Sequence, residues 1–232
     1  RNLSLGVTYS SLSELAGARA GNQIELVGSR IKFDGLNLTF SSDIVLTGAE
    51  SGMTFIDGGN GGGSITIGNG SSSVLANFSG INFYNFVLDA GKALFNVANN
   101  GTLVIEQSVF QNISGGTAVI AVSVGGLAYM DRAEFAFNSG TMAGAIYNNG
   151  GTVVAERSTF QDNTSAGNGG AITSLNGTLK LSASSVYRNT AVNGAGVYVN
   201  GGSLEMLNTT IAFNTGSGQG TALYYNGENL IL

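Results

Sequence analysis

Hydrophobic and polar residues alternate over short segments along most of the chain, and turns rich in glycine and asparagine separate these segments. In one stretch the strand-like segments cover residues 144–147, 152–156 and 158–160. Alternation of this kind places successive side chains on opposite faces of a β-strand. Each segment is too short to fold alone, so the pattern predicts strands that are stabilised by stacking on other strands.

The same unit recurs at a nearly constant spacing in the second half of the chain. Its clearest marker is an asparagine that returns once in each unit: Asn112, Asn138, Asn163, Asn189 and Asn214. An apolar residue lies three positions before each, and one further period upstream extends the column: Phe83, Val109, Phe135, Phe160, Val186 and Ile211. A fixed period of this length indicates one structural unit stacked on copies of itself.

Stacked units of this size predict an all-β fold, a single right-handed parallel β-helix of roughly eight coils with about 25 residues per coil. The apolar columns would then form one continuous core, with Val153, Leu179 and Leu204 on one face. We expect the five periodic asparagines to form an internal hydrogen-bonded ladder. A ligand-binding role for the same column is the alternative.

The sequence predicts a single domain over residues 1–232. Residues 1–23 are expected to form an N-terminal cap, with a short helix at 13–20. Residues 24–98 are expected to form irregular coils and residues 99–232 the regular repeats. Terminal repeats of solenoids are usually atypical, because they cover an otherwise open core.

The last residues, Leu230, Ile231 and Leu232, have the pattern of an unfinished strand without a polar cap. An exposed apolar strand edge favours pairing with another chain. This segment is therefore a possible assembly end, unless the sequence is a fragment of a longer solenoid.

The charge and composition of the chain limit the classes of partner that it can bind. The net charge is −5, the pI is near 4.6, and the nine lysine and arginine residues are scattered. Binding to nucleic acid or to an anionic membrane needs clustered basic groups, so neither is expected. Without cysteine or histidine, the chain has no thiolate nucleophile and lacks the usual general base near neutral pH. No apolar stretch has the length of a transmembrane helix.

One acidic column is a candidate for chemistry: Glu106, Asp131 and Glu156, flanked by Gln107, Arg132 and Arg157. Glycoside hydrolysis uses two carboxylates on either side of one bond, and Ca²⁺ prefers carboxylate oxygens. The column has no histidine, lysine or pocket-forming insertion beside it, which favours a solvated charge ladder. We therefore expect no catalytic, metal or cofactor site.

Three further features have a functional and a structural interpretation. Five tyrosines are candidates for a sugar-stacking surface or for ordinary packing: Tyr147, Tyr187, Tyr198, Tyr224 and Tyr225. The glycine-rich run at 57–63 lacks the lysine and the helix of a phosphate-binding loop, so a flexible loop is expected. Lys180 and Glu205 fall in register on neighbouring coils and predict an exposed ion pair.

The repeats also resemble those of a known family. Gly-Gly-Ala-Ile at 169–172 and Phe-Gln-Asp-Asn at 160–163 resemble the repeats of the polymorphic outer-membrane proteins of bacterial autotransporters, with weaker copies at 135–138, 143–146, 194–197 and 220–223. The resemblance covers roughly residues 80–225. It implies a right-handed β-helix passenger displayed on the cell surface and implicated in adhesion. Val186 and Ile211 depart from the pattern, which has an aromatic residue there.

These observations favour a non-catalytic structural β-solenoid of bacterial type, adhesin-like, with a cell-surface or glycan ligand. An extracellular or cell-surface location is expected, with a signal peptide removed upstream of Arg1. The second hypothesis is a self-assembling extracellular filament subunit that stacks head to tail through its open ends. The third is a glycan-active β-helix enzyme that uses Glu106, Asp131 and Glu156.

Overall fold

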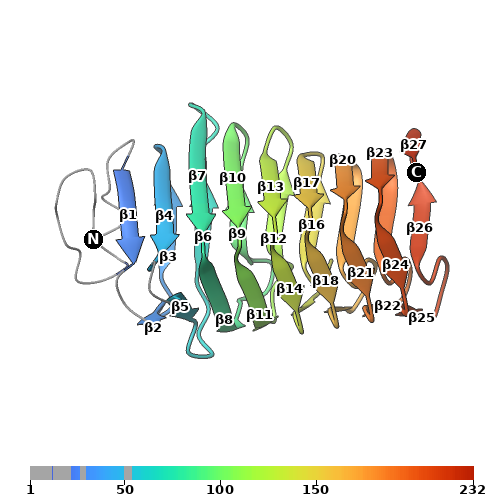
Figure 1. Ribbon diagram of the computed structural model, residues 1–232, viewed down its shortest axis with the longest axis horizontal. Helices are drawn as coiled ribbons and strands as arrows, with labels where there is room; N and C mark the ends of the chain where they lie inside the picture. The colour runs from blue at the N-terminus through green and yellow to red at the C-terminus, as the bar shows by residue number, and fades with distance from the viewer. Residues whose placement is uncertain (1–11, 13–21, 27–29, 50–53) are drawn as a thin grey trace.

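The computed structural model describes residues 12, 22–26, 30–49 and 54–232, and it is a parallel β-solenoid of about eight turns, with about 26 residues per turn. Figure 1 shows the coils side by side in sequence order along the long axis. The predicted all-β, coil-on-coil architecture is confirmed. The predicted cap and the short helix expected at 13–20 lie almost entirely outside the described residues.

In the described part of the chain, the strands form three parallel sheets. The eight-stranded sheet contains β2 (Arg30–Lys32), β5 (Thr54–Asp57), β8 (Ile81–Val87), β11 (Val109–Ser114), β14 (Glu134–Ala136), β18 (Thr159–Gln161), β21 (Ser185–Tyr187) and β24 (Thr210–Ala212). The four-stranded sheet contains β15 (Ser139–Gly140), β19 (Thr164–Ser165), β22 (Thr190–Ala191) and β25 (Thr215–Gly216).

The fifteen-stranded sheet consists of two rows that two long strands join, β20 (Ile172–Ser182) and β23 (Val197–Leu207). One row contains β1 (Asn22–Leu26), β4 (Ile44–Gly48), β7 (Val74–Ser79), β10 (Gly101–Glu106), β13 (Leu127–Asp131), β17 (Thr152–Glu156) and β27 (Asn229–Ile231). The other contains β3 (Asn37–Phe40), β6 (Ser64–Ile67), β9 (Ala93–Val97), β12 (Ala118–Ser123), β16 (Ile146–Asn149) and β26 (Leu223–Asn226).

Coil length differs between the two ends of the solenoid. In the first row of strands, Asn22 is paired with Ile44 and Ile44 with Ala76, so a short coil is followed by a long one. From β10 onward the step between paired residues is nearly constant, as between Thr102 and its partner Leu127. The longer and shorter steps are accommodated at the corners, because the paired strands must stay in register.

The core is one continuous cluster of apolar side chains that runs through the coils. Val153, Leu179 and Leu204 are paired in register and are at most 1% exposed, as predicted. A column of phenylalanine rings packs beside them, with centroids 4.7 to 5.0 Å apart and nearly parallel planes: Phe83, Phe110, Phe135 and Phe160. Val186 and Ile211 continue the column.

The predicted core column was wrong at one position. Val109 pairs with Asn82 and Glu134 and lies in the outward-facing row, whereas Phe110 is fully buried between Phe83 and Phe135. The predicted column was therefore one residue out of register on this coil. A shift of one residue moves a side chain to the opposite face of the strand.

Four of the five periodic asparagines form a buried ladder: Asn138, Asn163, Asn189 and Asn214. Each of the first three donates from Nδ2 to the Oδ1 of the next at 3.0 Å, and its backbone N–H donates to the same oxygen. Each of the four also donates from Nδ2 to the backbone carbonyl of a core-column residue one coil earlier. The ladder thus satisfies buried backbone and side-chain groups together.

Asn112 does not belong to the ladder, contrary to the prediction. It is exposed, and Ile113 takes the ladder position, where its backbone N–H donates to Asn138 Oδ1 at 3.0 Å. Asn112 instead occupies the corner that follows the outward face, with a φ of 55°. Asparagine tolerates this left-handed conformation better than most residues.

Every coil from β8 onward repeats that left-handed corner. The residues there have φ values of 54° to 57°: Asn85, Asn112, Phe137, Asp162, Arg188 and Phe213. Phe137 and Phe213 are 54% and 84% exposed, so their rings gain little from the core. Bulky side chains rarely adopt this conformation, and the strain costs about 1 to 3 kcal/mol.

Replacing Asn163 by leucine should lower the free energy of unfolding by about 2 to 5 kcal/mol, because it removes the partners of buried groups on Asn138, Phe135 and Asn189. Urea denaturation followed by circular dichroism measures the change. Asn112→Gly is the matched control, and its unfolding midpoint should stay close to that of the unchanged chain. Equal midpoints for Asn163→Leu and the unchanged chain would rule out a stabilising ladder.

Replacing Phe213 by asparagine should raise the free energy of unfolding by about 1 kcal/mol, because it relieves left-handed strain and removes an exposed ring. Phe213→Tyr is the control, since it keeps both the ring and the strain. Urea denaturation of both variants and of the unchanged chain measures the change in the free energy of unfolding. A loss of stability in Phe213→Asn would show that the ring has a structural role at this corner.

Candidate functional site

The outer face of the eight-stranded sheet contains a groove of about 270 Å³ that is open to solvent. It lies over three neighbouring strands, β5, β8 and β11. The groove is lined by the outward-facing Phe55, Tyr84, Val109, Gln111 and Asn112 and by Asn82, which is in the same outward row but only 7% exposed. The buried Phe83 also belongs to the lining.

Strand alternation and register place these side chains together. Phe55, Asn82 and Val109 are paired across the three strands, and Tyr84 and Gln111 are paired in the next outward row. Neighbouring strands are about 4.8 Å apart, so each row forms a continuous line of side chains along the solenoid. The groove therefore runs across coils rather than within one coil.

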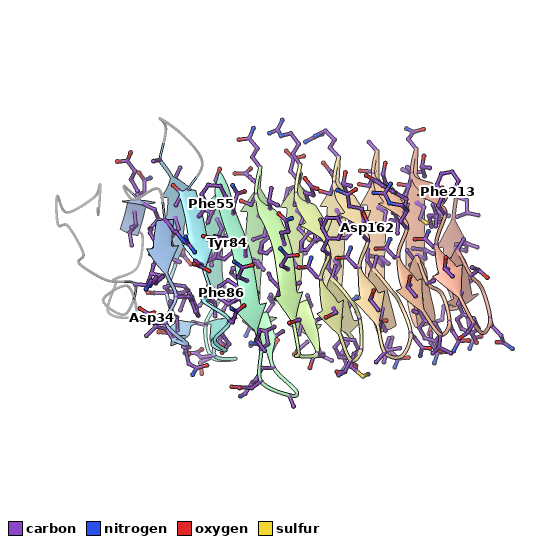
Figure 2. The ribbon with its side chains drawn as sticks, turned by 90° about the horizontal axis from the view of Figure 1, so that it is seen from below. Asp34, Phe55, Tyr84, Phe86, Asp162 and Phe213 are labelled. Carbon is purple, nitrogen blue, oxygen red and sulfur yellow. The ribbon has the colours of Figure 1, made fainter. Side chains whose placement is uncertain are left out.

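Two aromatic rings form one end of the groove. Phe55 and Tyr84 meet edge to face with centroids 5.5 Å apart, and the Arg30 guanidinium lies over the Tyr84 ring at 5.6 Å. Figure 2 shows Phe55 and Tyr84 close together in the N-terminal half of the molecule. Because each ring contacts the other and Arg30 lies over one face of Tyr84, the two rings are held in place without a ligand.

Arg30 also forms an ion pair with Asp57, a carboxylate that is only 4% exposed. Burial raises the pKa of Asp57, but the Gly59 backbone N–H and Arg30 stabilise the charged form, and the net effect is a lowered pKa. The two opposite charges next to the groove therefore balance each other at neutral pH.

The C-terminal half of the same face is occupied by side chains that bind one another. The Tyr187 hydroxyl donates to Gln161 Oε1 at 2.5 Å, and Gln161 Nε2 donates to Glu134 Oε1 at 2.6 Å. Arg188 pairs with Asp162, and this hydrogen bond lowers the pKa of the Asp162 carboxyl. The longer polar side chains in this half thus have protein partners.

The polar side chains of the groove, in contrast, are unpaired. Within the described part of the chain, the side-chain amides of Asn82, Gln111 and Asn112 have no hydrogen-bond partner. An amide both donates and accepts hydrogen bonds, so the three groups can pair with hydroxyl or carbonyl groups of a ligand. Apolar rings beside a few unpaired polar groups are typical of small-molecule sites.

The predicted acidic column is present, but its members are paired with neighbouring groups. Glu106, Asp131 and Glu156 are paired in register. Asp131 is 5% exposed and pairs with Arg132 at 3.1 Å and Arg157 at 2.5 Å. Glu156 accepts a hydrogen bond from the Tyr129 hydroxyl at 3.0 Å, and Glu106 one from the Asn77 amide at 3.5 Å. Among the described residues, no cluster of three acidic side chains is arranged to hold a metal ion.

The five tyrosines do not share one surface. Tyr147, Tyr198 and Tyr224 lie in a single row with Thr173 between the first two, and the rings of Tyr198 and Tyr224 stack at 4.6 Å. Tyr187 lies on the eight-stranded sheet, and Tyr225 packs against the core. The aromatic pair of the groove was not found from the sequence, because Phe55 and Tyr84 lie in the irregular coils.

Other predicted features are placed as follows. Lys180 and Glu205 form the expected ion pair at 2.8 Å, each partly exposed. In the glycine-rich run, Gly58 packs so closely that an added Cβ would lie 2.6 Å from the Phe86 ring. At the other end of the solenoid, Leu230, Ile231 and Leu232 are 43%, 53% and 73% exposed, and among the described strands β27 pairs only with β23.

The described residues contain no helix that is long and apolar enough to cross a membrane. In comparisons with known proteins, no family model, no curated protein and no solved structure matches the chain.

Proposed function

We propose that this protein is a non-catalytic, extracellular or cell-surface β-solenoid of bacterial type that acts as an adhesin-like module. The observation that carries the proposal is the groove on the eight-stranded sheet, where rigidly held rings lie beside unpaired amides. A solenoid suits this role, because a long stacked frame presents a fixed outer surface to a partner.

The repeat pattern supports the same proposal. The Phe-x-x-Asn repeats correspond to the stacked ring column and the asparagine ladder, so the residues that resemble polymorphic outer-membrane proteins are those that hold the coils together. Membership of that family, right-handed winding and surface display are parts of the proposal. They rest on the resemblance of the repeats.

The arrangement of the carboxylates favours binding over catalysis. Hydrolysis of a glycosidic bond needs two carboxylates that face a common bond, one of them available as an acid. Asp131 is held between two guanidinium groups, and Glu156 accepts a hydrogen bond from Tyr129. The glycan-active enzyme is for this reason the weakest of the three hypotheses.

Beads coated with the purified chain should adhere to cells in a panel of epithelial and bacterial lines, above the level of albumin-coated beads. Replacing Phe55 and Tyr84 together by serine should reduce the adhesion, because it removes the ring pair of the groove. Tyr198→Ser is the matched control, since it removes an aromatic side chain on a different sheet. Adhesion no higher than that of albumin across the panel would contradict the proposed function.

A filament subunit is the second candidate, and the exposed edge of the last coil favours it. An exposed apolar strand edge favours pairing with another strand. Where that strand belongs to a second copy, coils of one molecule continue into the next and produce open filaments.

Electron microscopy of the purified chain over a concentration series tests this candidate. Threads with the cross-section of the solenoid should appear as the concentration rises, and deletion of residues 229–232 should abolish them. Short rods at every concentration, or threads that persist in the deletion variant, would remove the proposed head-to-tail mechanism.

A further inference from the structure

We propose that the groove over β5, β8 and β11 binds a neutral oligosaccharide, and that Phe137 extends its aromatic platform on the next coil. This inference rests on the proposed adhesive function, because it names the ligand class of the same site. Four observations lead to it: the exposed ring of Phe137, the ring pair, the unpaired amides and the balance of charge.

Phe137 lies directly beside the groove. Gln111 is paired with Ala136, so the next residues along the two strands, Asn112 and Phe137, occupy the same corner on adjacent coils. Asn112 lines the groove and suits a left-handed corner, whereas Phe137 carries backbone strain and leaves 54% of its surface in water. Phe213 has the same strain and is 84% exposed without lining this groove, so the strain alone does not imply a ligand. What connects Phe137 with a ligand is its exposed ring at the corner next to Asn112.

The rings and amides together match a sugar. The ring faces of Phe55 and Phe137 are negative, and they attract the positive C–H groups on the flat side of a pyranose ring. Arg30 covers one face of Tyr84, so this ring contributes only its remaining surface. The exposed amides of Gln111 and Asn112 supply both donors and acceptors for the hydroxyl groups of the sugar, and the largely buried Asn82 amide lines the groove with them. An apolar ligand would leave these amides without partners, at a cost for each.

The charges in and around the groove favour a neutral sugar over a charged one. None of the residues that line the groove is ionisable near neutral pH. Among the described residues beside the groove, Arg30 and Asp57 form an ion pair, and Glu134, the cross-strand neighbour of Val109, is a further carboxylate. The whole chain carries a net charge of −5. An anionic polysaccharide would therefore meet no unpaired cation in the groove and an unfavourable overall field.

The volume of the groove and its direction along the solenoid favour a short oligosaccharide over a protein partner. The groove volume of about 270 Å³ is near the lower limit of small-molecule pockets. A stable protein interface buries about 800 Å² on each partner, and the adjacent part of this face is filled by the paired Glu134, Gln161 and Tyr187. An oligosaccharide that follows the solenoid axis contacts Phe55, Tyr84 and Phe137 in turn.

Isothermal titration calorimetry of the full chain with cellohexaose and with maltohexaose tests the inference. At least one of the two should bind saturably, and Phe137→Asn should weaken that binding by about 3- to 10-fold, the value of one aromatic contact. Tyr84→Ser should weaken it at least as much. Phe213→Asn is the matched control, because it makes the same replacement at an equivalent strained corner three coils away.

The asparagine variants also separate binding from folding. Phe137→Asn should raise stability, as Phe213→Asn should, so weaker binding by Phe137→Asn cannot come from a damaged fold. Binding of neither hexasaccharide, tighter binding of polygalacturonate, or unchanged affinity in Phe137→Asn would each overturn the inference.

The outcomes also distinguish this inference from the proposed function. If coated beads adhere to cells but neither hexasaccharide binds, the adhesive function holds and the ligand assignment fails. If a hexasaccharide binds through Phe137 but no cell in the panel is bound, the ligand assignment holds and the adhesive function fails.

Discussion

The buried asparagine ladder is the constraint on which the regular half of the solenoid depends. Each amide between Asn138 and Asn214 bonds the coil before it and the coil after it, and it also satisfies backbone groups that the core would otherwise leave unpaired. This pairing allows one register only. The ring column from Phe83 to Phe160 stacks on the same step, so a shift by one residue would break both features together.

A fixed register also fixes the corners. Once the ladder position is set, the residue before it must turn with a positive φ in every coil, whatever its type. Asparagine and aspartate tolerate that conformation at Asn112 and Asp162, whereas phenylalanine does not at Phe137 and Phe213. The core therefore accepts strain at an exposed position, because no other position can make the turn. Sequence variation at these corners changes the outer surface and leaves the stacking intact.

The fixed register also explains which features could be predicted from the sequence and which could not. The period, the short parallel strands, the core face with Val153 and four of the ladder residues were predictable from spacing alone. Asn112 was misassigned, because asparagine is favoured both in a ladder and at a left-handed corner, and Val109 then replaced Phe110 in the column. The groove was missed because coils of unequal length hide the equivalence of strands near the N-terminus.

The position of the groove follows from this division between regular and irregular coils. In the regular coils, outward side chains of neighbouring strands bond to one another, as Glu134, Gln161 and Tyr187 do. Where the irregular coils meet the first regular one, Asn82, Gln111 and Asn112 have no side-chain partner among the described residues and lie beside two fixed rings. Positions that break a local rule without gaining stability are where function is expected. At β11, the regular coils with their asparagine ladder and ring column therefore meet the part of the outer face where polar side chains are unpaired.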